Sequence, residues 1–270
     1  MRNGQREQEA MLAAMFIRKL FRTRMRPRIG VILGTGWGDT LPITNGTFCS
    51  FKDIPGFTAL DTLEGHHREL VIGRVADKGV AVLRGRVHLN EAPHDPSIAK
   101  MVRLQTEMLF HLGVKKLIVT SAVGSLRGAL DVGQIAVVNG FVTVFAPDMP
   151  LWAGEFCSPE DALSLALRKI AHEERGQLVT KEVGHVMVRG PFFEGRNYDK
   201  PLLAQTGAGV VGMSMLPEAC VAALYGIPVL GLGFVTNDDM EAHSHEENQA
   251  RAKAKSEHLG GFLTHIVGRL

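Results

Sequence analysis

The chain has 270 residues, 45% of them hydrophobic and 21% charged, and its formal net charge is only +2. A chain of this length buries about three-quarters of its unfolded surface, so its core needs neither disulfides nor a structural metal. The low charge argues against the broad basic surface that binds nucleic acid, and no nucleic-acid partner is expected. Three cysteines without paired spacing argue against a disulfide framework or a zinc site and indicate a reducing, cytoplasmic compartment.

The N-terminal segment combines arginines with a short apolar run at residues 11–17. The run is too short to span a membrane, and the basic residues that follow it at once do not fit a secretory signal. No membrane partner is therefore expected. The spacing of the apolar residues predicts an amphipathic helix within residues 1–27. Its apolar face is expected to comprise Leu12, Met15, Phe16 and Leu20.

Runs rich in Val and Ile and bounded by glycine predict buried strands along the chain. They span residues 28–33, 80–83, 116–120, 135–138, 186–188, 210–213 and 229–234. The predicted helices between them are 96–112 ending at Gly113, 158–174 capped by Ser158, 216–225, and one long closing helix from residue 246. This alternation predicts an α/β fold, a single domain over residues 1–270 with a central mixed, mostly parallel sheet flanked by helices.

In such folds ligands bind where strands end in loops. The first such loop, residues 34–38, is rich in glycine, and its backbone N–H groups and the Thr35 hydroxyl can hold an anion. Asp39 stands where a dinucleotide fingerprint needs glycine, and the Walker pattern is missing as well. On its own, this loop fits a plain structural turn equally well.

The loop at residues 84–91 carries Arg86 and His88, whose side chains point the same way by strand alternation. A guanidinium beside an imidazole suits a phosphate, and Glu91 can orient the histidine. The alternative is a solvated charged loop.

Further polar residues follow later strands. Ser121 comes directly after a buried strand, and Asn237 ends the last apolar one. Glu194 stands beside aromatic residues. The ring of a ligand can stack on an aromatic side chain here, and the N–H groups of that ligand can donate to the carboxylate. The alternatives are a strand-to-loop turn at Ser121 and an exposed glutamate beside a core phenylalanine at Glu194.

In combination and order, these loops resemble the trimeric purine nucleoside phosphorylase and methylthioadenosine phosphorylase family, from about Ile29 to the last helix. The strongest matches are Gly-Arg-Val-His at 85–88, Gly-Pro-Phe-Phe-Glu at 190–194, Val-Gly-Met-Ser at 211–214 with Pro-Glu at 217–218, and Thr-Asn at 236–237. The resemblance implies a nucleoside phosphorylase-like fold, a homotrimer, and phosphorolysis of a purine nucleoside to free base and ribose 1-phosphate.

The resemblance also implies roles for individual residues. Phosphate would be held by Thr35, His66, Arg86, His88, Ser121, Ala122 and Ser214. The nucleoside would contact Phe156, Phe193, Glu194, Met213, Asn237, Asp239 and His243, with Phe156 lent by a neighbouring subunit. The catalytic residues would be His88, Glu194 and Asn237. Inorganic phosphate would be a co-substrate, and neither a cofactor nor a metal is expected.

Such a reaction needs no side-chain nucleophile, because phosphate itself attacks C1′ of the ribose. The site must align two ligands, which contributes roughly 7–11 kcal/mol, and stabilise the leaving purine. An ionised Glu194 accepts a hydrogen bond from N1–H of hypoxanthine or guanine, whereas adenine has no proton at N1. Glu194 therefore predicts a preference for 6-oxopurines.

Several positions depart from the nucleoside branch of the family. Asn90 replaces its usual tyrosine, Gly195 replaces its usual threonine, and residues 121–127 are closer to the methylthioadenosine branch. Asp239 is similar to the paired aspartates with which that branch recognises the 6-amino group of its purine base. The alternatives are therefore a methylthioadenosine-type phosphorylase and a catalytically silent nucleoside-binding paralogue.

Two further hypotheses are weighed. His243, His245 and neighbouring carboxylates could form a metal cluster, but a loop capping the site, with one histidine near the 5′ substituent, is the preferred interpretation. The second hypothesis is a nucleosidase, which uses water in place of phosphate. Arg86, His88 and Ser214 argue against it, because a hydrolase needs no anion site.

Overall fold

A computed structural model describes residues 2–21, 26–57, 67–152, 154–173, 178–190, 194–195, 197–238 and 244–270. The strands are β1 (Ile29–Leu33), β2 (Thr44–Ser50), β3 (Glu69–Val75), β4 (Lys78–Arg84), β5 (Lys116–Ser125), β6 (Ile135–Val142), β7 (Thr180–Met187), β8 (Val210–Gly212) and β9 (Val229–Asn237). The helices are α1 (Arg2–Phe21), α2 (Pro96–Leu112), α3 (Leu165–Glu173), α4 (Asp199–Gln205), α5 (Leu216–Leu224), α6 (His245–Ala254) and α7 (Ser256–Arg269), with 3₁₀ turns η1 (Phe51–Asp53) and η2 (Pro159–Ala162).

The strands form one nine-stranded sheet in the order β2-β3-β4-β1-β5-β8-β7-β6-β9. Because β5 also pairs with β9, the strands β5, β8, β7, β6 and β9 close into a ring. Five of the nine pairings in the described chain are parallel, so the expected α/β class with a mixed, mostly parallel sheet is confirmed. The carboxyl ends of β1, β4, β5 and β9 meet at one edge, where the loops after them gather.

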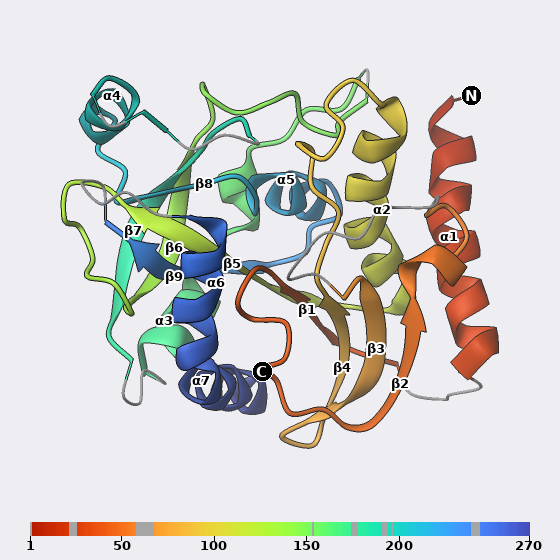
Figure 1. The fold of residues 1–270 in the computed structure, drawn as a ribbon. Helices are drawn as coiled ribbons and strands as arrows, with labels where there is room; N and C mark the ends of the chain where they lie inside the picture. Colours follow the sequence, from red (N-terminus) through yellow and green to blue (C-terminus); the bar gives the residue numbers. More distant parts are fainter. Residues whose placement is uncertain are drawn as a thin grey trace.

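Helices cover both faces of this sheet (Figure 1). The helices α1, α2 and α5 pack in one core with Ile32, Leu83 and Val119, and α3, α6 and α7 pack in the other with Val31 and Val82. Every residue of β1 is buried, as expected for a strand covered on both faces. The sheet is therefore a rigid support for the loops at its edge.

The predicted buried strands are all present, but two further strands were missed. β2 has the sequence Thr-Asn-Gly-Thr-Phe-Cys-Ser, and its first five residues are exposed at the sheet edge, so it gives no apolar signal. β3 links β2 to β4 by antiparallel pairing. β7 also begins at Thr180, earlier than predicted, because its first half is only partly buried and alternates with polar residues.

Helix ends follow the local sequence at α2, whose predicted bounds are confirmed. Asp95 caps its N-terminus by accepting from the Ser97 N–H at 2.8 Å, and Gly113 ends it with a left-handed φ of 111°. Two other predictions were wrong. The segment 158–174 divides into η2 and α3, with no side-chain cap from Ser158, and the single closing helix is broken at Lys255 into α6 and α7.

The N-terminal helix α1 exists, but the face predicted for it is wrong. Its buried side consists of Ala10, Ala13, Ala14 and Ile17, and of the predicted face only Phe16 packs against the core. Leu12, Met15 and Leu20 are exposed instead. None of the helices within the described ranges combines the length and the apolar character that crossing a bilayer requires.

Candidate active site

The glycine-rich loop after β1 is held tightly against the centre of the sheet. The Gly34 N–H donates to Thr120 Oγ1 at 3.0 Å, and the buried Trp37 indole donates to the Ser121 carbonyl at 3.0 Å. A side chain at Gly34 would lie 2.5 Å from the Thr120 carbonyl, so only glycine fits there. This packing brings the loop, with Thr35, against the end of β5.

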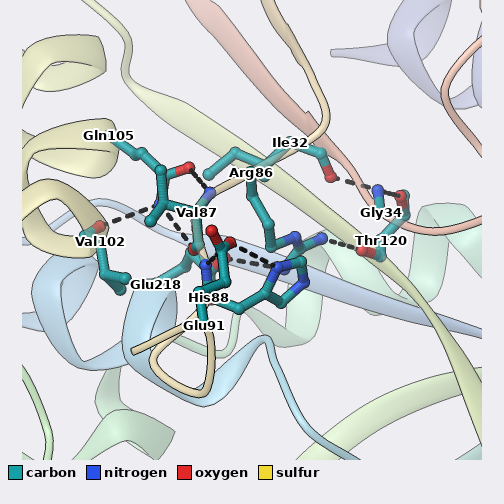
Figure 2. Close-up of polar contacts among 10 residues, drawn as sticks. All are labelled: Ile32, Gly34, Arg86, Val87, His88, Glu91, Val102, Gln105, Thr120 and Glu218. Carbon is teal, nitrogen blue, oxygen red and sulfur yellow. Dashed lines mark hydrogen bonds and ion pairs between the residues drawn. The ribbon is translucent and has the colours of Figure 1, made fainter. Parts of the chain in front are cut away.

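Arg86 lies beneath this loop and is 1% exposed. Its guanidinium donates to Glu218 Oε1 at 2.7 Å and to the Thr120 carbonyl (Figure 2). Glu218 is itself buried in the first turn of α5. Two charges can be buried in this way only because they are paired, and removing one would leave the other uncompensated.

Beside Arg86, the turn after β4 holds His88 against Glu91. Glu91 Oε1 accepts from the His88 backbone N–H at 2.7 Å and lies 3.3 Å from the ring Nδ1 (Figure 2). Burial alone would raise the pKa of Glu91, but hydrogen bonds from His88 and the charge of Arg68 outweigh it and lower that pKa. Burial lowers the pKa of His88, and the charge of Arg86 adds to this effect while Glu91 opposes it.

These shifts define the hydrogen-bonding capacity of His88. An ionised Glu91 accepts the proton of Nδ1, which fixes the tautomer of a neutral ring. Nε2, on the other side of the ring, is then an acceptor. Such a nitrogen matches the hydroxyl of a hydrogenphosphate ion, whose remaining oxygens suit backbone N–H groups and hydroxyl donors.

Ser121 adds a hydroxyl to the same region. It is buried in β5, and within the described residues its Oγ has no hydrogen-bond partner. A buried hydroxyl without a partner costs about 1–3 kcal/mol, so this group is suited to a ligand. Ala122 follows it in β5, and Ser214 follows β8, both partly exposed.

Met213 and Asn90 lie between this region and the end of β7. The Asn90 amide contacts Met213 Sδ at 3.6 Å, and a side chain at Gly190 would collide with both. The residue predicted to lie against the ribose therefore sits where β4, β7 and β8 meet. Asn90, which departs from the family pattern, is part of the same contact.

Glu194 borders a cavity of about 350 Å³ at the end of β7. The other lining residues are Val144, Phe145, Val188, Arg189, Asp199, Leu202 and Leu203. Burial raises the pKa of Glu194, an effect that the charge of Lys200 only partly offsets. Burial therefore disfavours the ionised form of this carboxyl group.

Asn237 ends β9 on the far side of the ring from β7. Its Oδ1 accepts from the Thr236 hydroxyl at 3.1 Å, and its Nδ2 lies over Gly124, where an added side chain would come within 3.0 Å. The structure thus brings together the predicted phosphate residues Arg86, His88 and Ser121. It places Asn237 and Glu194 at the ends of different strands, without a hydrogen bond between the described atoms of the two.

Phe156 is 92% exposed on the loop before η2 and does not enter this chain's own site. The preceding residue, Glu155, is fixed by Arg103 of α2 through contacts of 2.5 and 2.9 Å. Four other predicted residues lie outside the described part of the chain: His66, Phe193, Asp239 and His243. Among the residues that are described, no three His, Cys, Asp or Glu side chains form a metal-binding group.

Three groups around the site were missed by sequence reasoning. Thr120 and Glu218 fix Arg86, and Arg68 binds Glu91. Glu218 carried a signal, because it belongs to the Pro-Glu pair of the resemblance. Arg68 and Thr120 carried none, since their contacts join segments far apart in the sequence.

The sequence of this chain is similar to those of known proteins over most of its length. Residues 28–268 match the phosphorylase superfamily. The purine nucleoside phosphorylase of Rattus norvegicus is 30% identical, over 91% of this chain and 90% of that protein. The Mycobacterium tuberculosis purine nucleoside phosphorylase is 31% identical, over 89% of each chain.

Solved structures agree in fold. The purine nucleoside phosphorylase of Schistosoma mansoni in complex with adenosine superposes with a TM-score of 0.84 at 26% identity, over 97% of both chains. A Schistosoma purine nucleoside phosphorylase in complex with guanosine gives a TM-score of 0.82 at 25% identity, again over 97% of both chains.

Proposed function

The chain belongs to the phosphorylase superfamily and, within it, to the purine nucleoside phosphorylases, and we propose that it cleaves 6-oxopurine nucleosides with inorganic phosphate. The bond between C1′ and the purine breaks with its electron pair going to the base, and a phosphate oxygen forms the new bond to C1′. The base then takes up a proton. The products are free purine and ribose 1-phosphate, and phosphate is a co-substrate rather than a cofactor.

The observation that carries this proposal is the cluster of Arg86, His88 and Ser121 at the carboxyl ends of β4 and β5. A buried cation, a neutral imidazole acceptor and a hydroxyl without a partner among the described residues suit a partly protonated tetrahedral oxyanion. A nucleosidase has no use for such a site. The cluster therefore favours phosphate over water as the nucleophile.

In this proposal each predicted residue keeps its role. Thr35, His66, Arg86, His88, Ser121, Ala122 and Ser214 hold phosphate, and Met213 lies against the ribose. Glu194 and Asn237 bind the purine: Glu194 accepts from N1–H, and the Asn237 amide donates to the base as negative charge develops on it. Phe193, Asp239 and His243 line the base and 5′ positions.

The exposed ring of Phe156 supports a homotrimer in which each subunit completes its neighbour's sugar site. A large apolar ring held by a fixed neighbour, Glu155, loses little conformational entropy on docking. A cytoplasmic location remains the expectation from cysteine usage.

A second candidate is a 6-aminopurine substrate of the methylthioadenosine type. The raised pKa of Glu194 favours it, because a protonated carboxyl group can donate to the bare N1 of adenine. This candidate predicts that cleavage of adenosine relative to inosine increases as the pH is lowered.

The test is base release from inosine, adenosine and methylthioadenosine, each with and without phosphate, between pH 5.5 and 8. Phosphate-dependent cleavage of inosine alone at pH 7.5 would support the proposal. Cleavage of the methylthio compound alone would transfer the assignment to the second candidate. Cleavage that does not need phosphate would identify a nucleosidase, and purine binding without turnover would identify a silent paralogue.

A further inference from the structure

Arg68 is a buried arginine in a backbone conformation that arginine rarely adopts. It precedes β3, it is 7% exposed, and its φ is +52°. Its carbonyl accepts from the Phe51 N–H at 2.8 Å, which ties this turn to η1. Glycine takes a positive φ without steric cost, whereas a residue with a Cβ does not. A side chain kept here against the backbone preference therefore needs an interaction that offsets the strain.

That interaction is with the phosphate cluster. Arg68 donates from its guanidinium to Glu91 Oε2 at 2.5 Å, and the side chains of the two residues are 8% and 15% exposed. The other oxygen of Glu91, Oε1, takes the backbone N–H and the ring of His88. Each carboxylate oxygen thus has its own partner, and Arg68, Glu91 and His88 form a continuous chain.

The geometry distinguishes this chain from a simple surface ion pair. The backbone bond from His88 to Glu91 is short, at 2.7 Å, but the ring contact of 3.3 Å is long. Rotation of the carboxylate about its own bond would break the ring contact first. Arg68 opposes that rotation by holding Oε2, and its positive charge keeps the buried carboxylate ionised so that Oε1 remains an acceptor.

We propose that Arg68 is a positioning residue of the phosphate site, which holds Glu91 so that the His88 ring directs Nε2 toward the phosphate hydroxyl. Arg68 does not itself touch the reacting atoms. The inference rests on the function proposed above, because it assigns phosphate to the side of His88 away from Glu91. It adds a residue to that function which neither the strand pattern nor the family motifs indicated.

The decisive variant is Arg68→Gly, because glycine suits the positive φ, so that the guanidinium and its aliphatic stem are removed without adding backbone strain. We expect the KM for phosphate to rise about tenfold, the value of a hydrogen bond to a charged group, while the KM for inosine stays within about twofold. Arg168→Ala is the matched control. It breaks another 2.5 Å ion pair, with Glu182 between α3 and β7, and should leave both constants unchanged.

Two further variants separate positioning from folding. Arg68→Lys keeps the charge but loses the planar fork, and it should restore part of the phosphate affinity. In a Glu91→Gln background, Arg68→Gly should add little further loss, since the two act through one chain. An Arg68→Gly protein that is folded, as judged by circular dichroism, and binds phosphate like the wild type would overturn the inference, as would full additivity with Glu91→Gln.

Calorimetric titration with inorganic phosphate, in the absence of nucleoside, keeps this result apart from the proposed function. If the wild type binds phosphate but cleaves no nucleoside, the function fails while the role of Arg68 is still measured by the change in phosphate Kd. If the wild type cleaves inosine but Arg68→Gly changes neither constant, the inference alone fails. Wild-type protein that does not bind phosphate would overturn both the proposed function and the role of Arg68.

Discussion

Around Arg86 the charged side chains are buried and bonded to one another, whereas around Glu194 they border a cavity of about 350 Å³. We call these the phosphate half and the base half of the site, after the roles proposed for them. In the phosphate half, Arg86 joins β4 to β5 and α5, and Glu91 joins the 88–91 turn to the start of β3. In the base half, Glu194 follows a strand end and lines a cavity whose other walls are mainly apolar side chains.

The difference indicates how each half can change. Groups of the phosphate half serve both the fold and the ligand, so replacing them costs stability as well as activity. In the base half, burial opposes the charge of Glu194. We therefore expect that substrate preference can change in the base half without loss of the fold, and Gly195, which departs from the family pattern, directly follows Glu194.

Replacement of Arg86 by methionine should give the largest effect. It leaves Glu218 as a buried carboxylate without its cation, and we expect the free energy of unfolding to fall by about 3–5 kcal/mol. Urea denaturation measures it. Arg86→Met combined with Glu218→Leu removes both charges and should recover most of the loss, although neither protein should bind phosphate well.

Arg168→Met, which breaks a more exposed pair, should cost at most about 1 kcal/mol. Equal losses for the two single variants would contradict the distinction between buried and exposed pairs.

Glu194→Gln, in contrast to Arg86→Met, should reduce activity without reducing stability. We expect kcat/KM for inosine to fall roughly 10²- to 10³-fold, because the leaving base loses a charged partner. The pKa of Glu194 is raised, so the native state disfavours the ionised carboxylate, and the stability contributed by this group decreases as the pH rises through that pKa. The variant should consequently be as stable as the wild type or more stable at pH 8. A loss of stability at pH 8 would show that Glu194 also holds the fold.

His185 allows a test of the strand beneath the base half. It is fully buried in β7, edge-on to Phe141, and neither ring nitrogen has a partner within the described residues. Burial lowers its pKa from 6.5 to about 4. The unfolded chain therefore takes up a proton below pH 6.5 that the native state refuses until about pH 4, and stability is lost as the pH falls through this window.

The size of that loss is roughly 3 kcal/mol for a shift of this extent. Thermal and urea unfolding of the wild type and of His185→Leu, compared between pH 7 and pH 4, isolate it, because the other titrating groups are shared. The difference in stability should move in favour of the variant as the pH falls. Parallel pH curves for the two proteins would show that His185 has a partner in solution.

Trp37→Phe should give the smallest effect. The phenyl ring keeps most of the packing in the loop after β1 but loses the hydrogen bond to the Ser121 carbonyl, which is worth about 1 kcal/mol. The phosphate KM should rise only slightly, since the loop keeps the bond from Gly34 to Thr120. A change in the nucleoside KM instead would show that the two halves are coupled through β5.

The sequence predicts the buried strands well, since β1, β5 and β9 are covered on both faces and so have continuous apolar runs. It fails where burial is one-sided or absent. β2 is exposed at the edge, and α1 buries three alanines and Ile17 while Leu12, Met15 and Leu20 stay exposed.

The site residues also divide into those that a local sequence pattern indicates and those that it does not. Arg86 and His88 could be found because strand alternation and a family motif both mark them. Arg68 could not, because its contact with Glu91 joins residues 23 positions apart through a turn whose positive φ no pattern in the sequence specifies. Local signals therefore find the groups that face the ligand, and tertiary contacts decide which groups hold them.

The pairing of β5 with β9 sets the order in which a newly made chain can become functional. β1, β4 and β5 emerge from the ribosome long before β9, and before α6, whose Ala252 packs so close to Gly36 that a side chain there would collide with it. At a synthesis rate of roughly 5–20 residues per second, the nascent chain spends seconds with the edge of β5 unpaired and prone to join another strand. Phosphate and nucleoside cannot stabilise the chain in that interval, because ligands stabilise only a state that binds them. The growing sheet is therefore completed without the stabilisation that bound substrates give to the finished protein.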